Sequence, residues 1–164
     1  MSTPFFALYV AKQLHASTLT LGLIYALIAL AMSLTAPSVG WIVDRKSPKG
    51  FFTKYALVVS FLLSGAVQWC YPYITQAYWA FILSIILGIS LGVIALLLFS
   101  LLLKEVEGSS RGKLVGLGNT ALKIGNLVGI IIGTIVQAEY NFLITFLFIG
   151  SCYFVLAILT MRYK

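Results

Sequence analysis

Five apolar runs of roughly 20 residues or more divide this chain of 164 residues, and they constrain its fold more than any other feature. The runs cover residues 19–43, 55–74, 77–103, 114–136 and 141–161. A helix needs about 20 apolar residues to cross the roughly 30 Å hydrocarbon core of a bilayer, so each run is long enough to span a membrane. A further apolar stretch, residues 3–11, is too short to span and is expected to be the outer half of a helix whose beginning is missing.

The composition places the chain in a lipid bilayer. Apolar residues make up 61% of the sequence and charged residues 9%, whereas a soluble domain has about 45–50% and about 25%. None of the runs alternates polar and apolar residues as the strands of a membrane barrel do, so the backbone must satisfy its hydrogen bonds within helices. We therefore expect an all-α, polytopic transmembrane helical bundle, a single membrane domain over residues 1–164. A soluble enzyme and a nucleic-acid-binding protein are excluded.

The positions of the basic residues predict the orientation. One side of the expected spans carries nine of the eleven: Arg45, Lys46, Lys49, Lys54, Lys104, Arg111, Lys113, Arg162 and Lys164. Because cytoplasmic loops collect Lys and Arg, this side and the C-terminus are expected to be cytoplasmic in a multi-pass protein of the cell membrane. Aromatic residues gather on the opposite side and are expected to form an interfacial belt. They are Trp69, Tyr71, Tyr73, Tyr78 and Trp79.

A glycine and an acidic–basic pair mark the inner end of the first full run. Gly40 has no side chain and so permits a neighbouring helix to approach closely. Asp44 lies near a helix end where the dipole disfavours a carboxylate, and it is therefore expected to need a nearby cation or the N-terminus of another helix. Arg45 and Lys49 follow and can supply the cation or bind lipid phosphate.

This segment resembles the signature loop of the major facilitator superfamily, in which a glycine, three residues, Asp-Arg and a basic cluster join the second and third helices of a six-helix half. Gly40, Asp44 and Arg45 match the motif and Lys49 matches a distal basic position, whereas Pro48 departs from the usual basic run. We call these four matching residues the inner-gate motif. The order of the expected helices resembles that of such a half over nearly the whole chain. Most of the first helix of the half is missing. The resemblance implies secondary active transport of a small molecule.

Four of the five glycines in the fourth full run are predicted to pack against another helix. They are Gly116, Gly125, Gly129 and Gly133. Their spacing resembles the fifth-helix motif of the family's drug–proton antiporters, and this resemblance implies efflux. That motif has a proline where this chain has Ile130 and a further glycine where it has Thr134. Ser84, Gly88 and Gly92 in the third full run are predicted to form a second packing face.

Lys123 is the charged residue that lies deepest in a run, nine residues past Leu114 and about 13 Å along the helix axis. A charge at this depth is costly and usually faces a cavity or a partner. The alternative is a lysine that extends its amine back to the membrane interface. Other polar residues of the runs join it as candidates for a transport path, which comprises Tyr25, Gln68, Asn119, Lys123 and Asn126.

The sequence shows no sign of an enzyme. It has no phosphate-binding Gly-Lys-Ser/Thr loop, no metal-ligand spacing and a single histidine, so we expect no catalytic residue, no metal and no cofactor. Cys70 and Cys152 fall in apolar runs and are expected to be buried, inert thiols. No acidic residue lies in the middle of a run. If the protein is coupled to protons, the acidic residue that carries the proton must therefore lie outside this chain, or Lys123 must take its place.

The resemblance favours the C-terminal half of such a transporter. N-terminal halves often carry an arginine on their fourth helix, at the position of Ser84 here, and no basic residue occurs between Lys54 and Lys104. A substrate path lies between two halves, so the expected partners are a small-molecule substrate and a second half or a homodimer partner. The alternative is a non-transporting membrane interaction protein or an inactive fragment. A transporter requires the polar candidates to face a common interior.

Overall fold

The computed structural model describes residues 3–13, 17–46, 51–104 and 111–162, and these form helices joined by short connections. The helices are α1 (Thr3–Gln13), α2 (Thr18–Lys46), α3 (Phe51–Cys70), α4 (Ala77–Lys104), α5 (Arg111–Glu139) and α6 (Phe142–Arg162), with the 3-10 turn η1 (Tyr71–Tyr73) between α3 and α4. No strand occurs within these ranges. The prediction of an all-α bundle is confirmed.

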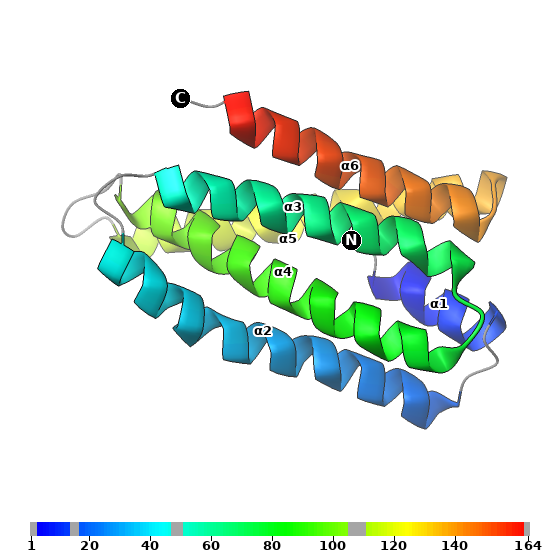
Figure 1. Cartoon of the computed structure of the whole chain (residues 1–164). Helices are drawn as coiled ribbons and strands as arrows, with labels where there is room; N and C mark the ends of the chain where they lie inside the picture. Colours follow the sequence, from blue (N-terminus) through cyan, green and yellow to red (C-terminus); the bar gives the residue numbers. More distant parts are fainter. Residues whose placement is uncertain (1–2, 14–16, 47–50, 105–110, 163–164) are drawn as a thin grey trace.

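Five of the helices, α2 to α6, are long and apolar enough to cross a membrane, as predicted. They lie lengthwise beside one another in the order α2, α4, α3 and α6, with α5 behind and the short α1 at one end (Figure 1). The second expected span, residues 55–74, agrees to within two residues with the candidate span Thr53–Tyr73, in which α3 ends at Cys70 and η1 follows. Pro72 lies in the tight turn that follows, where its missing N–H removes no bond of a longer helix.

The two ends of the bundle differ in chemistry. One end, here called the basic end, carries Lys54 in the first turn of α3, Lys113 in the first turn of α5 and Arg162 in the last turn of α6. The other, here called the aromatic end, carries Trp69 and Tyr73 at the end of α3 and in η1. This separation of charge and aromatic residues follows the loop pattern predicted from the sequence.

Helices α2 and α4 pack through glycines. A Cβ atom added at Gly88 would lie 2.7 Å from the carbonyl oxygen of Ile28 and 2.8 Å from Cβ of Ala31. One added at Gly92 would lie 3.1 Å from the carbonyl oxygen of Met32 and 3.2 Å from Cβ of Thr35. Only glycine therefore permits this approach without a shift of α2, and the predicted packing face of α4 is confirmed.

A second glycine contact, which the sequence analysis missed, joins α3 to α6. A Cβ atom added at Gly65 would lie 3.1 Å from the carbonyl oxygen of Gly150. The indole ring of Trp69 fills the space beside Gly150, and its N–H donates a hydrogen bond to the carbonyl oxygen of Leu147 at 3.1 Å. Trp69 thus bonds to α6, in addition to its place at the aromatic end.

The short helix α1 is fixed to the aromatic end by its aromatic residues. Phe6 and Tyr9 are buried, and the Tyr9 hydroxyl donates to the carbonyl oxygen of Ile74 at 3.2 Å. The Phe6 ring lies 4.4 Å from the ring of Tyr71, centroid to centroid. Tyr71 is fully buried, with its hydroxyl 3.5 Å from that of Ser84, so its expected place in an exposed aromatic belt is wrong. Tyr71 does not lie at the membrane interface, because its ring is buried against that of Phe6.

Tyr9→Phe tests this attachment. The substitution removes one hydroxyl whose acceptor is a buried carbonyl oxygen, so we expect the free energy of unfolding to fall by about 1 kcal/mol in detergent micelles. Tyr73→Phe is the matched control, because Tyr73 is 69% exposed and its hydroxyl should add little stability. An equal change in the two variants would mean that the Tyr9 bond does not hold α1 in place.

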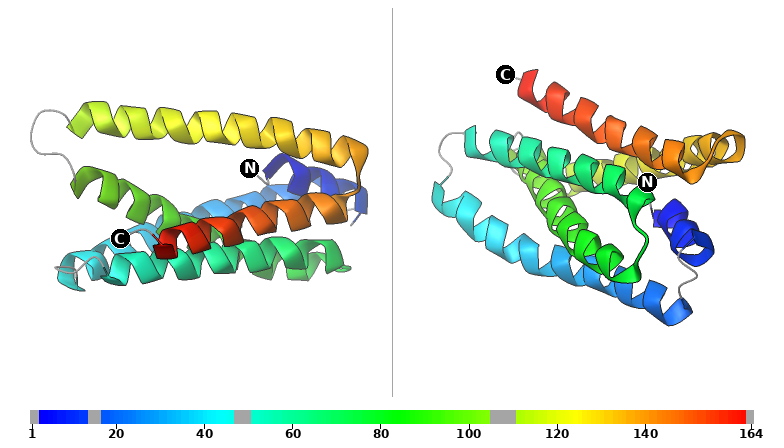
Figure 2. Two further views of the ribbon diagram at one scale, coloured as in Figure 1. Left: turned by 90° about the horizontal axis from the view of Figure 1, so that it is seen from above. Right: turned by 45° about the vertical axis from the view of Figure 1, so that its right-hand side comes forward.

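Two of the spanning helices are left largely uncovered. Half of the most apolar stretch of α3 is buried (50%), but only 11% of that of α2 and 6% of that of α5. Figure 2 shows α5 running apart from the row of the other long helices along most of its length. The faces of α2 and α5 are therefore more open to lipid, water or a partner than those of the other spanning helices.

Candidate functional site: an exposed polar face on α5 and an apolar groove between α2 and α4

Three of the candidate path residues share one face of α5. Asn119, Lys123 and Asn126 follow one another at intervals of four and three residues, which places them along one side of a helix. All three side chains are exposed. Lys123 lies twelve residues past Arg111, about 18 Å from the start of α5, and therefore near the middle of this span.

The structure places the other two candidates in the packed part of the bundle. Tyr25 is half-buried on α2, and its ring meets that of Phe6 edge-on with 6.5 Å between centroids. Gln68 is fully buried on α3. The structure thus brings Asn119, Lys123 and Asn126 together on α5 and leaves Tyr25 and Gln68 apart from them.

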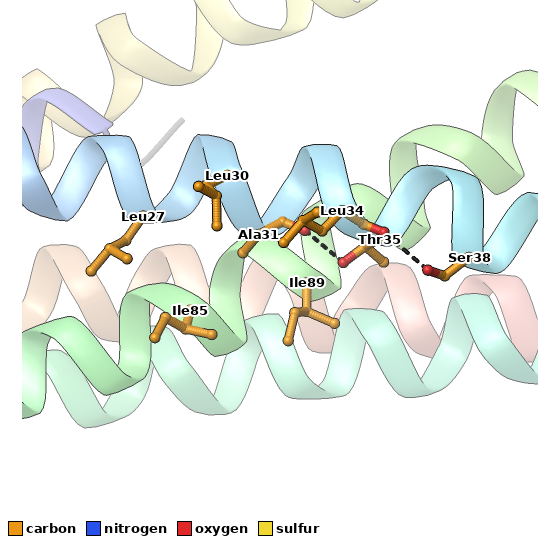
Figure 3. Close-up of a pocket in the computed structure, with 8 residues that line it drawn as sticks. All are labelled: Leu27, Leu30, Ala31, Leu34, Thr35, Ser38, Ile85 and Ile89. Atoms are coloured by element: carbon orange, nitrogen blue, oxygen red, sulfur yellow. Dashed lines mark hydrogen bonds between the residues drawn. The ribbon is translucent and has the colours of Figure 1, made fainter.

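An apolar groove of about 320 Å³ lies between α2 and α4, and the sequence analysis did not identify it. Its lining residues (Figure 3) are Leu27, Leu30, Ala31, Leu34, Thr35, Ser38, Ile85 and Ile89. The hydroxyls of Thr35 and Ser38 donate to the carbonyl oxygens of Ala31 and Leu34, at 2.6 and 3.0 Å, so they offer no donor to the groove. The leucines at intervals of three and four residues were the signal available in the sequence.

The inner-gate motif lies at the end of α2. Asp44 and Arg45 belong to its last turn, and their side chains, together with Lys49, lie outside the described residues. A Cβ atom added at Gly40 would lie 3.8 Å from Cδ1 of Leu96, which is ordinary van der Waals contact. The close helix approach that Gly40 permits therefore stays a prediction that needs a partner outside this bundle.

The glycines of α5 differ in their surroundings. Nothing in the described part of the chain lies within 4 Å of a Cβ atom added at Gly116 or Gly125, whereas at Gly133 it would meet the ring of Phe5 on α1. Gly129 is half-exposed. Packing of a helix against Gly116, Gly125 and Gly129 stays a prediction that needs a partner outside this bundle.

The surroundings of the two cysteine thiols also differ from those predicted from the sequence. Cys70 and Cys152 are both free and exposed on the outer faces of α3 and α6, so the expectation that they are buried is wrong. Hydropathy places a residue in a span but does not say whether it faces a helix or lipid, since both surroundings are apolar. Among the described residues, no three His, Cys, Asp or Glu side chains group as metal ligands would.

Comparison with known proteins identifies the family of the chain. The whole chain, residues 1–164, matches the model of the Major Facilitator Superfamily. Two curated relatives, each described as "Multi-drug resistance efflux pump PmrA", come from Streptococcus pneumoniae strains TIGR4 and R6. Each is 27% identical over 142 residues, which cover 85% of this chain and 33% of the relative. The chain thus spans about a third of the length of these relatives. No solved structure matches it significantly.

Proposed function

Because the chain belongs to the Major Facilitator Superfamily, we propose that it forms one half of a path for secondary active efflux of small, largely apolar compounds. The exposed polar face of α5 is the observation that carries this proposal. A carboxamide left in hydrocarbon without hydrogen bonds costs roughly 2–7 kcal/mol, and a charge costs more. Asn119, Lys123 and Asn126 are therefore expected to face water or a polar partner.

A second half is needed to enclose such a path. The uncovered faces of α2 and α5 are the surfaces available for it, and the open space at Gly116 and Gly125 leaves room for the close approach of another helix. A second copy of this chain or a different half would meet this need. The absence of a basic residue between Lys54 and Lys104 favours descent from a C-terminal half.

The groove between α2 and α4 supports an apolar substrate. Its wall is formed by leucine and isoleucine side chains, and the two hydroxyls in it are already bonded to their own helix. Pockets of this size with apolar walls bind compounds mainly through the area they bury. This agrees with the multidrug efflux for which the relatives are named.

Orientation and coupling are parts of the same proposal. The basic end, which carries Lys54, Lys113 and Arg162, is placed in the cytoplasm, because Lys and Arg accumulate on that side. The C-terminus then lies inside the cell. Coupling to protons requires either an acid from the second half or the amine of Lys123, since no acidic residue lies in the middle of a span.

Lys123→Cys tests the position of the path. In a background with Cys70→Ser and Cys152→Ser, which removes both exposed thiols, we expect the new thiol to react with a charged, membrane-impermeant reagent. The reason is that thiolate forms only where water reaches the side chain. Ethidium, used as the transported dye, is expected to slow the labelling, and Lys123→Met is expected to abolish ethidium efflux from cells.

Val128→Cys is the control, because Val128 lies five residues, about 7.5 Å, further along α5 on its opposite side and is 45% exposed. It is expected to face lipid and to stay unlabelled. Labelling of Lys123→Cys from the cytoplasmic side alone, indifferent to ethidium, together with an active Lys123→Met variant, would contradict the path. Lys123 would then be a lysine that extends to the interface.

A further inference from the structure

Lys123 carries a positive charge near the middle of α5, and no described side chain of opposite charge lies near it. Glu139 is the one acidic residue whose side chain the structure describes, and it is the last residue of α5. It lies 16 residues beyond Lys123, which corresponds to about 24 Å along the helix axis. This separation is far greater than the length of a lysine side chain, so the two residues cannot form an ion pair.

The other three acidic residues of the sequence belong to the ends of spans. They are Asp44, Glu105 and Glu107. Asp44 lies in the last turn of α2, and the two glutamates come between the end of α4 and the start of α5. None of the five candidate spans has an acidic residue in its middle. A second copy of this chain would therefore bring another lysine to the depth of Lys123 and no carboxylate to pair with it.

The face of α5 that carries Lys123 is open to a neighbouring helix, because α5 runs apart from the row of the other long helices (Figure 2). Asn119 and Asn126 lie one turn on either side of Lys123 and are exposed. Gly116 lies two turns before Lys123 on the same side, and nothing in the described part of the chain lies within 4 Å of a Cβ atom added there. The backbone of another helix can therefore come close, and it would meet one cation flanked by two carboxamide donors.

We propose that Lys123 forms an ion pair with an aspartate or glutamate near the middle of a spanning helix in the second half, and that this half is not a second copy of the chain. Ionisable residues within membrane spans are costly and pair with one another. A neutral polar neighbour would bond to the amine but leave its charge uncompensated, and the largely apolar substrates proposed above bring no negative charge. A carboxylate supplies the charge and can also accept hydrogen bonds from Asn119 and Asn126.

This inference rests on the proposed function, since it takes the partner to be the second half of the path, but its test measures association and not transport. The purified full chain is mixed with synthetic spanning helices in phosphatidylcholine vesicles. The probes are leucine–alanine peptides of about 20 residues with a single glutamate, glutamine or lysine at the centre. A fluorescent donor on Cys70, in a Cys152→Ser background, and an acceptor on the peptide report association by energy transfer.

We expect the glutamate peptide to bind at least about tenfold more tightly than the glutamine peptide, because only glutamate supplies a charge opposite to that of the amine. Lys123→Met removes the charge and should bind the two peptides equally. Lys123→Glu should instead prefer the lysine peptide, and this reversal would show that the altered chain is still folded. Lys113→Met is the matched control, because it makes the same change in the first turn of α5, and it should keep the preference for glutamate.

Two results would overturn the proposal directly. They are equal binding of the glutamate and glutamine peptides to the unaltered chain, and a preference for glutamate that survives Lys123→Met. Self-association of the unaltered chain that excludes the glutamate peptide would also overturn it, in favour of a second copy. A preference for glutamate that depends on Lys123, found together with full ethidium efflux by Lys123→Met, would support the ion pair and contradict the transport path alone.

Discussion

Gly88→Leu is expected to lower the free energy of unfolding of this bundle by about 3 kcal/mol, the upper end of what an overpacked side chain costs. The atoms in the way are the backbone carbonyl of Ile28 and Cβ of Ala31, at 2.7 and 2.8 Å from a Cβ atom at position 88. Backbone cannot change rotamer, so α2 must move away from α4 as a whole. Unfolding in mixed micelles, followed by helical circular dichroism, measures the loss.

Gly125→Leu is the control for that experiment. Nothing in the described part of the chain lies within 4 Å of a Cβ atom there, so the isolated chain should accommodate the leucine with little change in stability. Similar losses at positions 88 and 125 would contradict the assignment of the α2–α4 contact to Gly88. The same leucine at position 125 should, however, weaken association with a second half, because it fills the open face of α5.

Asp44→Asn is expected to reduce ethidium efflux at least about tenfold, which corresponds to about 1.4 kcal/mol, while leaving the fold intact. Asp44 lies in the last turn of α2, where the helix dipole opposes a negative charge. A carboxylate kept at such a place is expected to be held by a cation or by the N-terminus of a neighbouring helix. Asparagine keeps the shape of the side chain and removes the charge, so it breaks this attraction alone.

Lys46→Gln serves as the control for Asp44→Asn, because Lys46 ends the same helix and does not match the motif. It should transport ethidium at nearly the unaltered rate. Protein amount in the membrane must be equal in the two variants, which immunoblotting establishes. Unchanged efflux in Asp44→Asn would remove the gate role from this residue.

The spans could be predicted from the sequence because the cost of leaving backbone and charge in hydrocarbon depends on composition and length alone. Five helices accordingly lie where five apolar runs were found. The stripe of Ser84, Gly88 and Gly92 was also predictable, since small residues at four-residue intervals form one face. Hydropathy and periodicity are local properties, and these features depend on nothing else.

The pairing of faces could not be predicted in this way. Gly65 and Gly150 are far apart in the sequence, and nothing in either helix alone indicates that they meet. Tyr71 was expected among exposed aromatic residues and is buried, because α1 brings Phe6 onto its ring. In a bilayer both the lipid side and the packed side of a helix are apolar, so the sequence contains little information on which side is which. Gln68 is the exception that polarity could have marked as buried.

The hydroxyl of Tyr9 ties α1 to the chain just beyond η1, with the carbonyl oxygens of Ile74 and Pro72 at 3.2 and 3.4 Å. Swinging α1 outward would break this bond and separate its ring contacts with Phe142 and Phe146, which lie at 5.6 and 5.4 Å between centroids. The short helix is therefore expected to travel with the aromatic end as a rigid body. In the proposed transport, α1 and the aromatic end would then move together while the bundle rocks against a second half along α2 and α5.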